Sequence, residues 1–180
     1  MTSDADDTRF RPFGPLATAL GKLGALVVLA LVLVFGPLAM MALNDALTWP
    51  AWRIPAGPLI GGAFMASALA IWLYCTHVFE RAGRGTPFIT EPPKRLVTVG
   101  MYRYSRNPIY VGHLAILYGW FFIFGHPTLL LYAVAWTAIL QAVILAWEEP
   151  HLRARFGEDF DRYARTVPRW FLIRPRRPEH

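Results

Sequence analysis

Three long runs without a charged residue constrain the fold of this chain more than any other feature. They cover residues 24–43, 57–79 and 109–147, with lengths of 20, 23 and 39 residues. An apolar run of about 20 residues is what a single helix needs to cross the hydrocarbon core of a bilayer. Composition agrees, because 55% of the residues are hydrophobic and only 17% are charged, which excludes an ordinary soluble domain. The sequence therefore predicts an integral-membrane protein built from helices.

The third run is too long for one crossing. Gly125, His126 and Pro127 provide turn chemistry near its middle, so we expect a tight helical hairpin with arms at residues 109–124 and 128–147. The prediction is an all-α, integral-membrane helical bundle with about four transmembrane helices, the last two forming the hairpin.

We expect residues 1–180 to form a single domain with three polar segments. Residues 1–12 are predicted to be a mobile tail, residues 80–106 a cytoplasmic connector, and residues 148–180 a cytoplasmic C-terminal segment. Apolar residues in the last segment recur at helical spacing, which predicts one or two amphipathic helices at the membrane interface, broken at Gly157. These apolar positions are Leu152, Phe156, Phe160, Tyr163 and Val167.

Basic residues are divided unevenly among the segments that connect the runs. Of the 18 Lys and Arg residues, 17 fall before the first run, between the second and third runs, or after the third; Arg53 is alone between the first and second. Because cytoplasmic loops carry the excess of Lys and Arg, we expect both termini in the cytoplasm, in a membrane such as a bacterial inner membrane. The net charge of +6 then favours anionic lipid headgroups, and no nucleic-acid partner is expected.

The start of the third run carries the residues with the most chemistry. Asn107 and Pro108 are typical of an N-cap followed by the first helical residue, and the unpaired N–H groups of such a helix start can bind an anionic group beside Arg106. Glu148 and Glu149 lie at the far end of the hairpin, and both arms of a hairpin meet at one membrane face. The arrangement of Arg and Glu is complementary to a zwitterionic ligand.

These motifs resemble those of a known superfamily. Residues 106–112 are similar to the Arg-(His/Asn)-Pro-x-Tyr-x-Gly motif of integral-membrane methyltransferases. The Glu pair, residues 156–163 and residues 167–169 follow in a layout that resembles the isoprenylcysteine carboxyl methyltransferase and phospholipid methyltransferase superfamily, over roughly the last half of the chain. The resemblance implies S-adenosylmethionine-dependent methyl transfer to a lipophilic or small acceptor, through a carboxyl, thiol or amine group, at the cytoplasmic membrane face.

The resemblance also implies which residues surround the methyl donor, with the segment 156–169 closing over it. They are Gly100, Tyr102, Arg103, Arg106, Asn107, Pro108, Tyr110, Gly112, Glu148 and Glu149. We expect Arg106 near the methionyl carboxylate or the adenosine edge, and Glu149 near the ammonium or a ribose hydroxyl. The aromatic faces of Tyr102, Tyr104 or Tyr110 suit the sulfonium cation.

Two other functions stay open. Sterol reductases carry a similar Arg-His-x-Asn-Tyr-x-Gly element, which would make this chain an NADPH-dependent membrane reductase, although Pro108 and the Glu pair favour the methyltransferase. The other alternative is a non-catalytic membrane protein of the same fold. No spacing typical of metal ligands occurs, so no metal is expected.

The sequence departs from the eukaryotic prenylcysteine enzymes in the helix before the Glu pair. Those enzymes carry an arginine in this helix, whereas residues 137–147 of this chain contain no basic residue. We therefore expect that the acceptor is not a farnesylated cysteine held by its carboxylate as in those enzymes, unless Lys94, Arg95 or Arg103 replaces the missing contact. His113 is either a packing residue or a general base for a thiol or amine acceptor.

Overall fold

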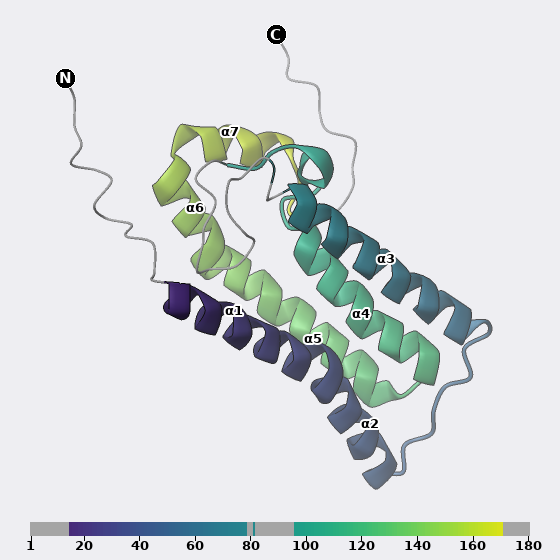
Figure 1. The fold of residues 1–180 in the computed structure, drawn as a ribbon. Helices are drawn as coiled ribbons and strands as arrows, with labels where there is room; N and C mark the ends of the chain where they lie inside the picture. Colours follow the sequence, from purple (N-terminus) through teal and green to yellow (C-terminus); the bar gives the residue numbers. More distant parts are fainter. Residues whose placement is uncertain (1–14, 79–80, 82–95, 171–180) are drawn as a thin grey trace, which may run out of the picture.

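The structure, a computed structural model, describes residues 15–78, 81 and 96–170, and every regular element in these residues is helical (Figure 1). The all-α prediction is confirmed. Two π-helical segments, η2 and η5, continue the longer helices, and one 3₁₀ turn, η4, precedes α4. The elements are α1 (Pro15–Ala30), η2 (Leu31–Phe35), α2 (Gly36–Ala46), α3 (Gly57–Val78), η4 (Gly100–Arg103), α4 (Pro108–Phe124), α5 (Pro127–Val143), η5 (Ile144–Glu148), α6 (Glu149–Phe156) and α7 (Glu158–Thr166).

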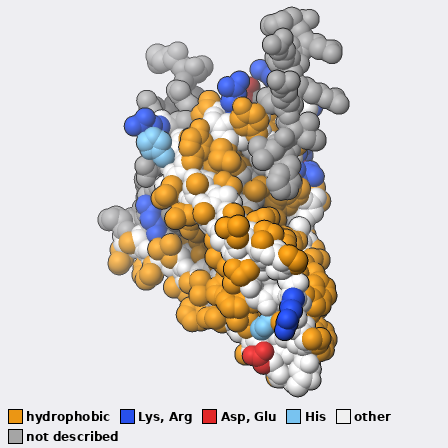
Figure 2. Space-filling view, turned by 90° about the vertical axis from the view of Figure 1, so that its right-hand side faces the viewer, with side chains coloured by type: hydrophobic (Ala, Val, Ile, Leu, Met, Phe, Trp, Pro, Cys, Tyr) orange, Lys and Arg blue, Asp and Glu red, His pale blue; other side chains and the backbone are white. Residues whose placement is uncertain are grey.

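Among the described residues, three helices are long and apolar enough to cross a membrane: Ala19–Ala46, Gly57–Val78 and Pro127–Phe156. The fourth predicted crossing, α4, has 17 residues and a length of about 25 Å, slightly less than the core of a typical bilayer. Hydrophobic side chains are spread over the middle and lower part of the face shown in Figure 2, and many are strongly exposed in the structure, such as Leu59 at 77%. Such a surface is stable where lipid covers it, which confirms an integral-membrane bundle.

Small residues allow α3 and α4 to pack closely. A Cβ atom on Gly61 of α3 would stand 2.5 Å from the carbonyl oxygen of Gly119 on α4. Gly125 then ends α4 in the left-handed conformation, with φ of 67°, and α5 begins two residues later. The backbone N–H of Trp52 donates to the carbonyl of Gly125 at 2.8 Å, which ties the loop between α2 and α3 to this turn. The predicted tight hairpin is confirmed.

The first long helix is irregular where Pro37 interrupts its backbone hydrogen bonds. Proline has no N–H, so the carbonyl of Leu33 loses its helical partner, and the π-helical segment η2 frees the carbonyl of Val32 as well. Aromatic side chains of the hairpin replace both donors. Trp120 Nε1 donates to the Leu33 carbonyl at 3.0 Å, and the Tyr132 hydroxyl donates to the Val32 carbonyl at 3.0 Å. Neighbouring helices thus provide hydrogen bonds for two carbonyl groups that would be costly to leave unpaired inside a bilayer.

The C-terminal segment forms two helices, α6 and α7, at the end of the bundle opposite the hairpin turn (Figure 1). Gly157, with φ of 54°, separates them, as expected. The apolar face of α7 is buried against the protein, since Phe160 and Tyr163 pack on Leu96 and Phe156. The helical spacing of these residues is therefore accounted for by a small core that fixes α7 beside the start of α4.

Several predictions fall on residues outside the described part of the chain. These are the tail at residues 1–12, Lys94 and Arg95 of the connector, and both termini.

Candidate active site

The connection that enters α4 is held by a local turn and a buried tyrosine. Gly100 begins the 3₁₀ turn η4 with φ of 63°, a left-handed backbone conformation that glycine adopts more easily than other residues. Tyr102 in that turn is 7% exposed and packs against Cys75 and Val97. Its carbonyl accepts a hydrogen bond from the Tyr163 hydroxyl at 2.7 Å, so α7 fixes the turn from the other side. Burial raises the pKa of both tyrosines, which keeps their hydroxyls protonated.

The residues just before α4 are bonded to the chain that follows α7. The backbone N–H of Arg106 donates to the carbonyl of Pro168 at 2.9 Å. The carbonyl of Arg169 accepts from Ser105 Oγ at 3.2 Å and from Asn107 Nδ2 at 3.1 Å. Pro108 begins the helix and Asn107 is its N-cap position, as predicted, but the Asn107 side chain makes no capping bond. It is turned to the C-terminal segment, which leaves the first N–H groups of α4 without a side-chain cap.

Glu149 lies between two arginines. Arg169 donates to its two carboxylate oxygens, with Nε to Oε1 at 2.6 Å and Nη2 to Oε2 at 3.0 Å. Arg106 Nη1 stands 3.0 Å from the same Oε1, and the Arg106 and Glu149 side chains are each 12% exposed. The hydrogen bond to Glu149 raises the pKa of Arg169, whereas burial lowers the pKa of Arg106 more than Glu149 raises it. A guanidinium stays charged in proteins, so this cluster is ionic.

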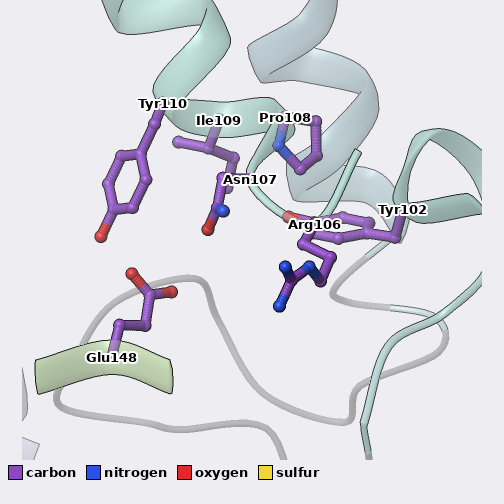
Figure 3. Close-up of a pocket in the computed structure, with 7 residues that line it drawn as sticks. All are labelled: Tyr102, Arg106, Asn107, Pro108, Ile109, Tyr110 and Glu148. Carbon is purple, nitrogen blue, oxygen red and sulfur yellow. The ribbon is translucent and has the colours of Figure 1, made fainter. Parts of the chain in front are cut away.

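A cavity of about 110 Å³ opens beside this cluster, at the start of α4. Its walls combine a guanidinium, a carboxylate and aromatic rings, and in Figure 3 the Tyr110 hydroxyl faces the Glu148 carboxylate across it. Two buried polar atoms at the cavity have no hydrogen-bond partner among the described residues, namely Arg106 Nε and Glu148 Oε2. One is a donor and the other an acceptor, so the cavity offers both to a ligand. The lining residues are Tyr102, Arg106, Asn107, Pro108, Ile109, Tyr110 and Glu148.

Six of the ten residues expected around the donor line this cavity, and Ile109 joins them without having been expected. The other four lie elsewhere. Glu149 is engaged by the two arginines, Arg103 is exposed on the turn η4, and Gly112 and Gly100 are packing sites. The Cβ of any other residue would stand 3.1 Å from Trp72 Cδ1 at position 112 and 2.7 Å from the Tyr74 hydroxyl at position 100.

Arg169 and Ser105 contribute to the site without having been assigned a role from the sequence. Arg169 belongs to the motif at residues 167–169, which gave no indication of its partner, 20 residues away at Glu149. Ser105 gave no signal, because its bond to the Arg169 carbonyl spans 64 residues and local periodicity cannot show such a pairing. The described residues contain no group of His, Cys, Asp and Glu that could hold a metal ion.

Comparison with known proteins places the chain in a family. Residues 58–159 of the chain, more than half of its length, match the family described as phospholipid methyltransferase. The chain is 36% identical over 75 residues to a protein-S-isoprenylcysteine O-methyltransferase of Schizosaccharomyces pombe. That alignment covers 41% of this chain and 31% of the relative, so the chain spans about a third of the length of the curated relative it matches. No solved structure matches the chain.

Proposed function

We propose, because the chain belongs to the phospholipid methyltransferase family, that it transfers a methyl group from S-adenosylmethionine to a lipophilic or small acceptor. The observation that carries the proposal is the pair of unpartnered atoms, Arg106 Nε and Glu148 Oε2, at one cavity. A buried polar atom without a partner is costly, and a ligand with matching charges removes that cost. The amino-acid end of S-adenosylmethionine has such charges, a carboxylate and an ammonium.

Three side chains would hold the donor. Arg106 binds the methionyl carboxylate through the Nε edge that Glu149 leaves available, and Glu148 accepts from the ammonium or from a ribose hydroxyl. Tyr110, whose ring lines the same cavity, faces the sulfonium. Glu148 thereby takes the role that the sequence suggested for Glu149, because the Glu149 carboxylate already receives three contacts from arginines.

The cavity lies at the end of the bundle that carries α6 and α7 and most of the described arginines, whereas Arg53 follows Trp52 beside the hairpin turn at the other end. This distribution supports a cytoplasmic site and cytoplasmic termini. A polar donor then enters from the cytoplasm, and a lipophilic acceptor arrives from the bilayer. S-adenosylmethionine supplies an activated methyl group, so the task of the protein is mainly to align donor and acceptor and to exclude water.

Titration of the purified protein with S-adenosylhomocysteine and, separately, with NADPH tests the proposal. We expect the first to bind and the second not to bind. Binding of NADPH alone would support a membrane reductase, and binding of neither would support a non-catalytic protein of this fold; both results would overturn the proposal. Transfer of a labelled methyl group to a panel of lipophilic and small acceptors then establishes catalysis.

A further inference from the structure

Three more buried nitrogens lack a hydrogen-bond partner among the described residues, and two of them lie on the neighbouring helices α3 and α4, outside the lining of the donor cavity. These two are Nε1 of Trp72 on α3 and Nε2 of His113 on α4. The two rings meet edge to face, with centroids 5.2 Å apart and an interplanar angle of 73°. Leaving such groups unpaired costs about 1–3 kcal/mol each, and phenylalanine at either position would avoid the cost. Their presence together therefore points to a ligand that pairs with both.

The pair lies next to the donor cavity, farther along the bundle. The ring of His113 is 5.8 Å, centroid to centroid, from the ring of Tyr110. Tyr110 lines the cavity and lies about one helical turn before His113. Gly112 lets the indole of Trp72 approach α4, because a Cβ there would stand 3.1 Å from Trp72 Cδ1. Trp72 also packs against the apolar cluster of Leu33, Leu117 and Ala133. The two rings thus lie between the polar cavity and the apolar middle of the bundle, where an acceptor from the bilayer would meet the donor.

We propose that Trp72 and His113 form the acceptor subsite, and that this subsite takes a lipophilic thiol. The inference rests on the proposed methyl transfer and adds to it the class of acceptor and a base. The subsite has an N–H donor in Trp72 and, in the tautomer protonated at Nδ1, a proton acceptor in His113; the two described helices that form it, α3 and α4, supply no cation, because neither contains Lys or Arg.

Each kind of acceptor makes a different demand on these two groups. A carboxylate arrives without a proton, so it has no use for a base and needs a cation instead. An amine nitrogen has one lone pair, and a hydrogen bond from the Trp72 N–H would occupy the pair that must attack. A thiol sulfur gives its proton to His113 Nε2 and still has lone pairs both for the indole N–H and for the methyl carbon. A thiol is also far more acidic than an alcohol, with a free pKa of about 8.5 for cysteine, so of these two acceptors it makes the smaller demand on a base.

The transfer step balances with these groups alone. The sulfur of the acceptor forms a bond to the donor methyl carbon while the bond between that carbon and the donor sulfonium breaks, and the electron pair of the broken bond stays on the donor sulfur. The acceptor proton moves to His113 Nε2, giving an imidazolium that later releases the proton to water. The Trp72 N–H stabilises the negative charge that develops on the acceptor sulfur.

The test compares acceptors of equal chain length: 1-decanethiol, decylamine and decanoic acid, each with labelled S-adenosylmethionine, and a prenylcysteine carboxylate analogue as a fourth. We expect methyl transfer to the thiol at a rate at least tenfold above the others. His113→Gln should lower the rate with decanethiol by about 100-fold or more, the usual contribution of a general base, and Trp72→Phe by about tenfold, the loss of one hydrogen bond. His126→Gln is the matched control, because His126 also has a buried unpartnered nitrogen, Nδ1, but lies at the opposite hairpin turn; it should keep the wild-type rate.

An acidic arenethiol, already ionised at neutral pH, separates a base from a packing residue. Because this acceptor needs no base, His113→Gln should retain most of the wild-type rate with it while losing the rate with decanethiol. Equal losses with both thiols would overturn the role of His113 as a base. Preferential transfer to the amine or to either carboxylate would overturn the thiol subsite.

Binding measurements distinguish failure of this inference from failure of the proposed function. His113→Gln should bind S-adenosylhomocysteine within about twofold of wild type, because His113 does not line the donor cavity, and should bind decanethiol in the presence of S-adenosylhomocysteine at least tenfold more weakly. Unchanged decanethiol binding contradicts the subsite alone. Absence of S-adenosylhomocysteine binding in the wild-type protein contradicts the proposed function itself.

Discussion

Two adjacent glutamates should respond in opposite ways to the same substitution. Glu149 is bonded to Arg169 and Arg106, whereas one oxygen of Glu148 is buried without a partner at the cavity. Glu149→Gln should therefore lower stability, and Glu148→Gln should lower donor affinity.

The expected loss of stability follows from how deeply the Glu149 cluster is buried. Exposed ion pairs contribute about 0–1 kcal/mol, and breaking a fully buried pair costs about 3–5 kcal/mol. The cluster lies between these limits, since Arg106 and Glu149 are each 12% exposed and Arg169 is 27% exposed. We expect Glu149→Gln to cost about 2 kcal/mol, which corresponds to a fall of roughly 4–8 °C in melting temperature for a chain of this size.

Glu148→Gln removes a buried charge whose Oε2 has no described partner. The side-chain hydrogen bond between Tyr110 and Glu148 can be kept by the amide, so the melting temperature should stay constant or rise. The donor, by contrast, loses a charge-assisted hydrogen bond of about 1.5–3 kcal/mol, which weakens S-adenosylhomocysteine binding by roughly ten- to 150-fold.

Thermal unfolding and calorimetric titration in one detergent measure both effects. Glu158→Gln is the control for the chemical change itself, because Glu158 is exposed at the start of α7, and it should match wild type in both assays. If Glu149→Gln left the melting temperature unchanged while Glu148→Gln lowered it, the assignment of the two carboxylates would be refuted.

Three further predictions concern the bundle and its orientation. Gly36→Ala should lower stability by about 1–3 kcal/mol, because the new methyl group would collide with the hydroxyl of Tyr132; adding Tyr132→Phe should recover part of the loss, and thermal unfolding measures both. Tyr163→Phe should cost about 1 kcal/mol by removing a buried hydrogen bond, and an unchanged melting temperature would show that this bond does not hold α7 in place. In a variant without the native cysteine, single cysteines at positions 5 and 178 should react only with reagents that reach the cytoplasm, and labelling of either from the exterior would refute the topology.

The helices were predictable from the sequence because their signals are local. Charge-free runs of known length predicted α3, and turn residues in the middle of the third run predicted the hairpin formed by α4 and α5. The partners of the irregular segment η2 were not predictable. Trp120 and Tyr132 reach its carbonyls across 87 and 100 residues, and such contacts depend on how the helices pack.

The residues that line the cavity were predictable only in part. Six of the ten residues that the family resemblance implied lie there, among them Arg106, Asn107 and Tyr110 at one helix start. The sequence did not predict which glutamate of the pair faces the cavity. Adjacent side chains of a helix point about 100° apart, and the π-helical segment η5 changes the direction in which the side chains point just before Glu149.

The contacts of Arg106 explain how one side chain can serve both the fold and a ligand. A guanidinium presents its five N–H donors in a planar fork, so Nη1 can pair with Glu149 while Nε stays directed elsewhere. A lysine at this position would have one nitrogen for both tasks and would satisfy the nearer charge, Glu149. Arg169 binds both oxygens of the Glu149 carboxylate. Glu149 therefore needs only one N–H group of Arg106, and the other donors of Arg106 stay available. The C-terminal segment therefore contributes to ligand binding indirectly, by fixing the direction in which Arg106 offers its unpaired N–H.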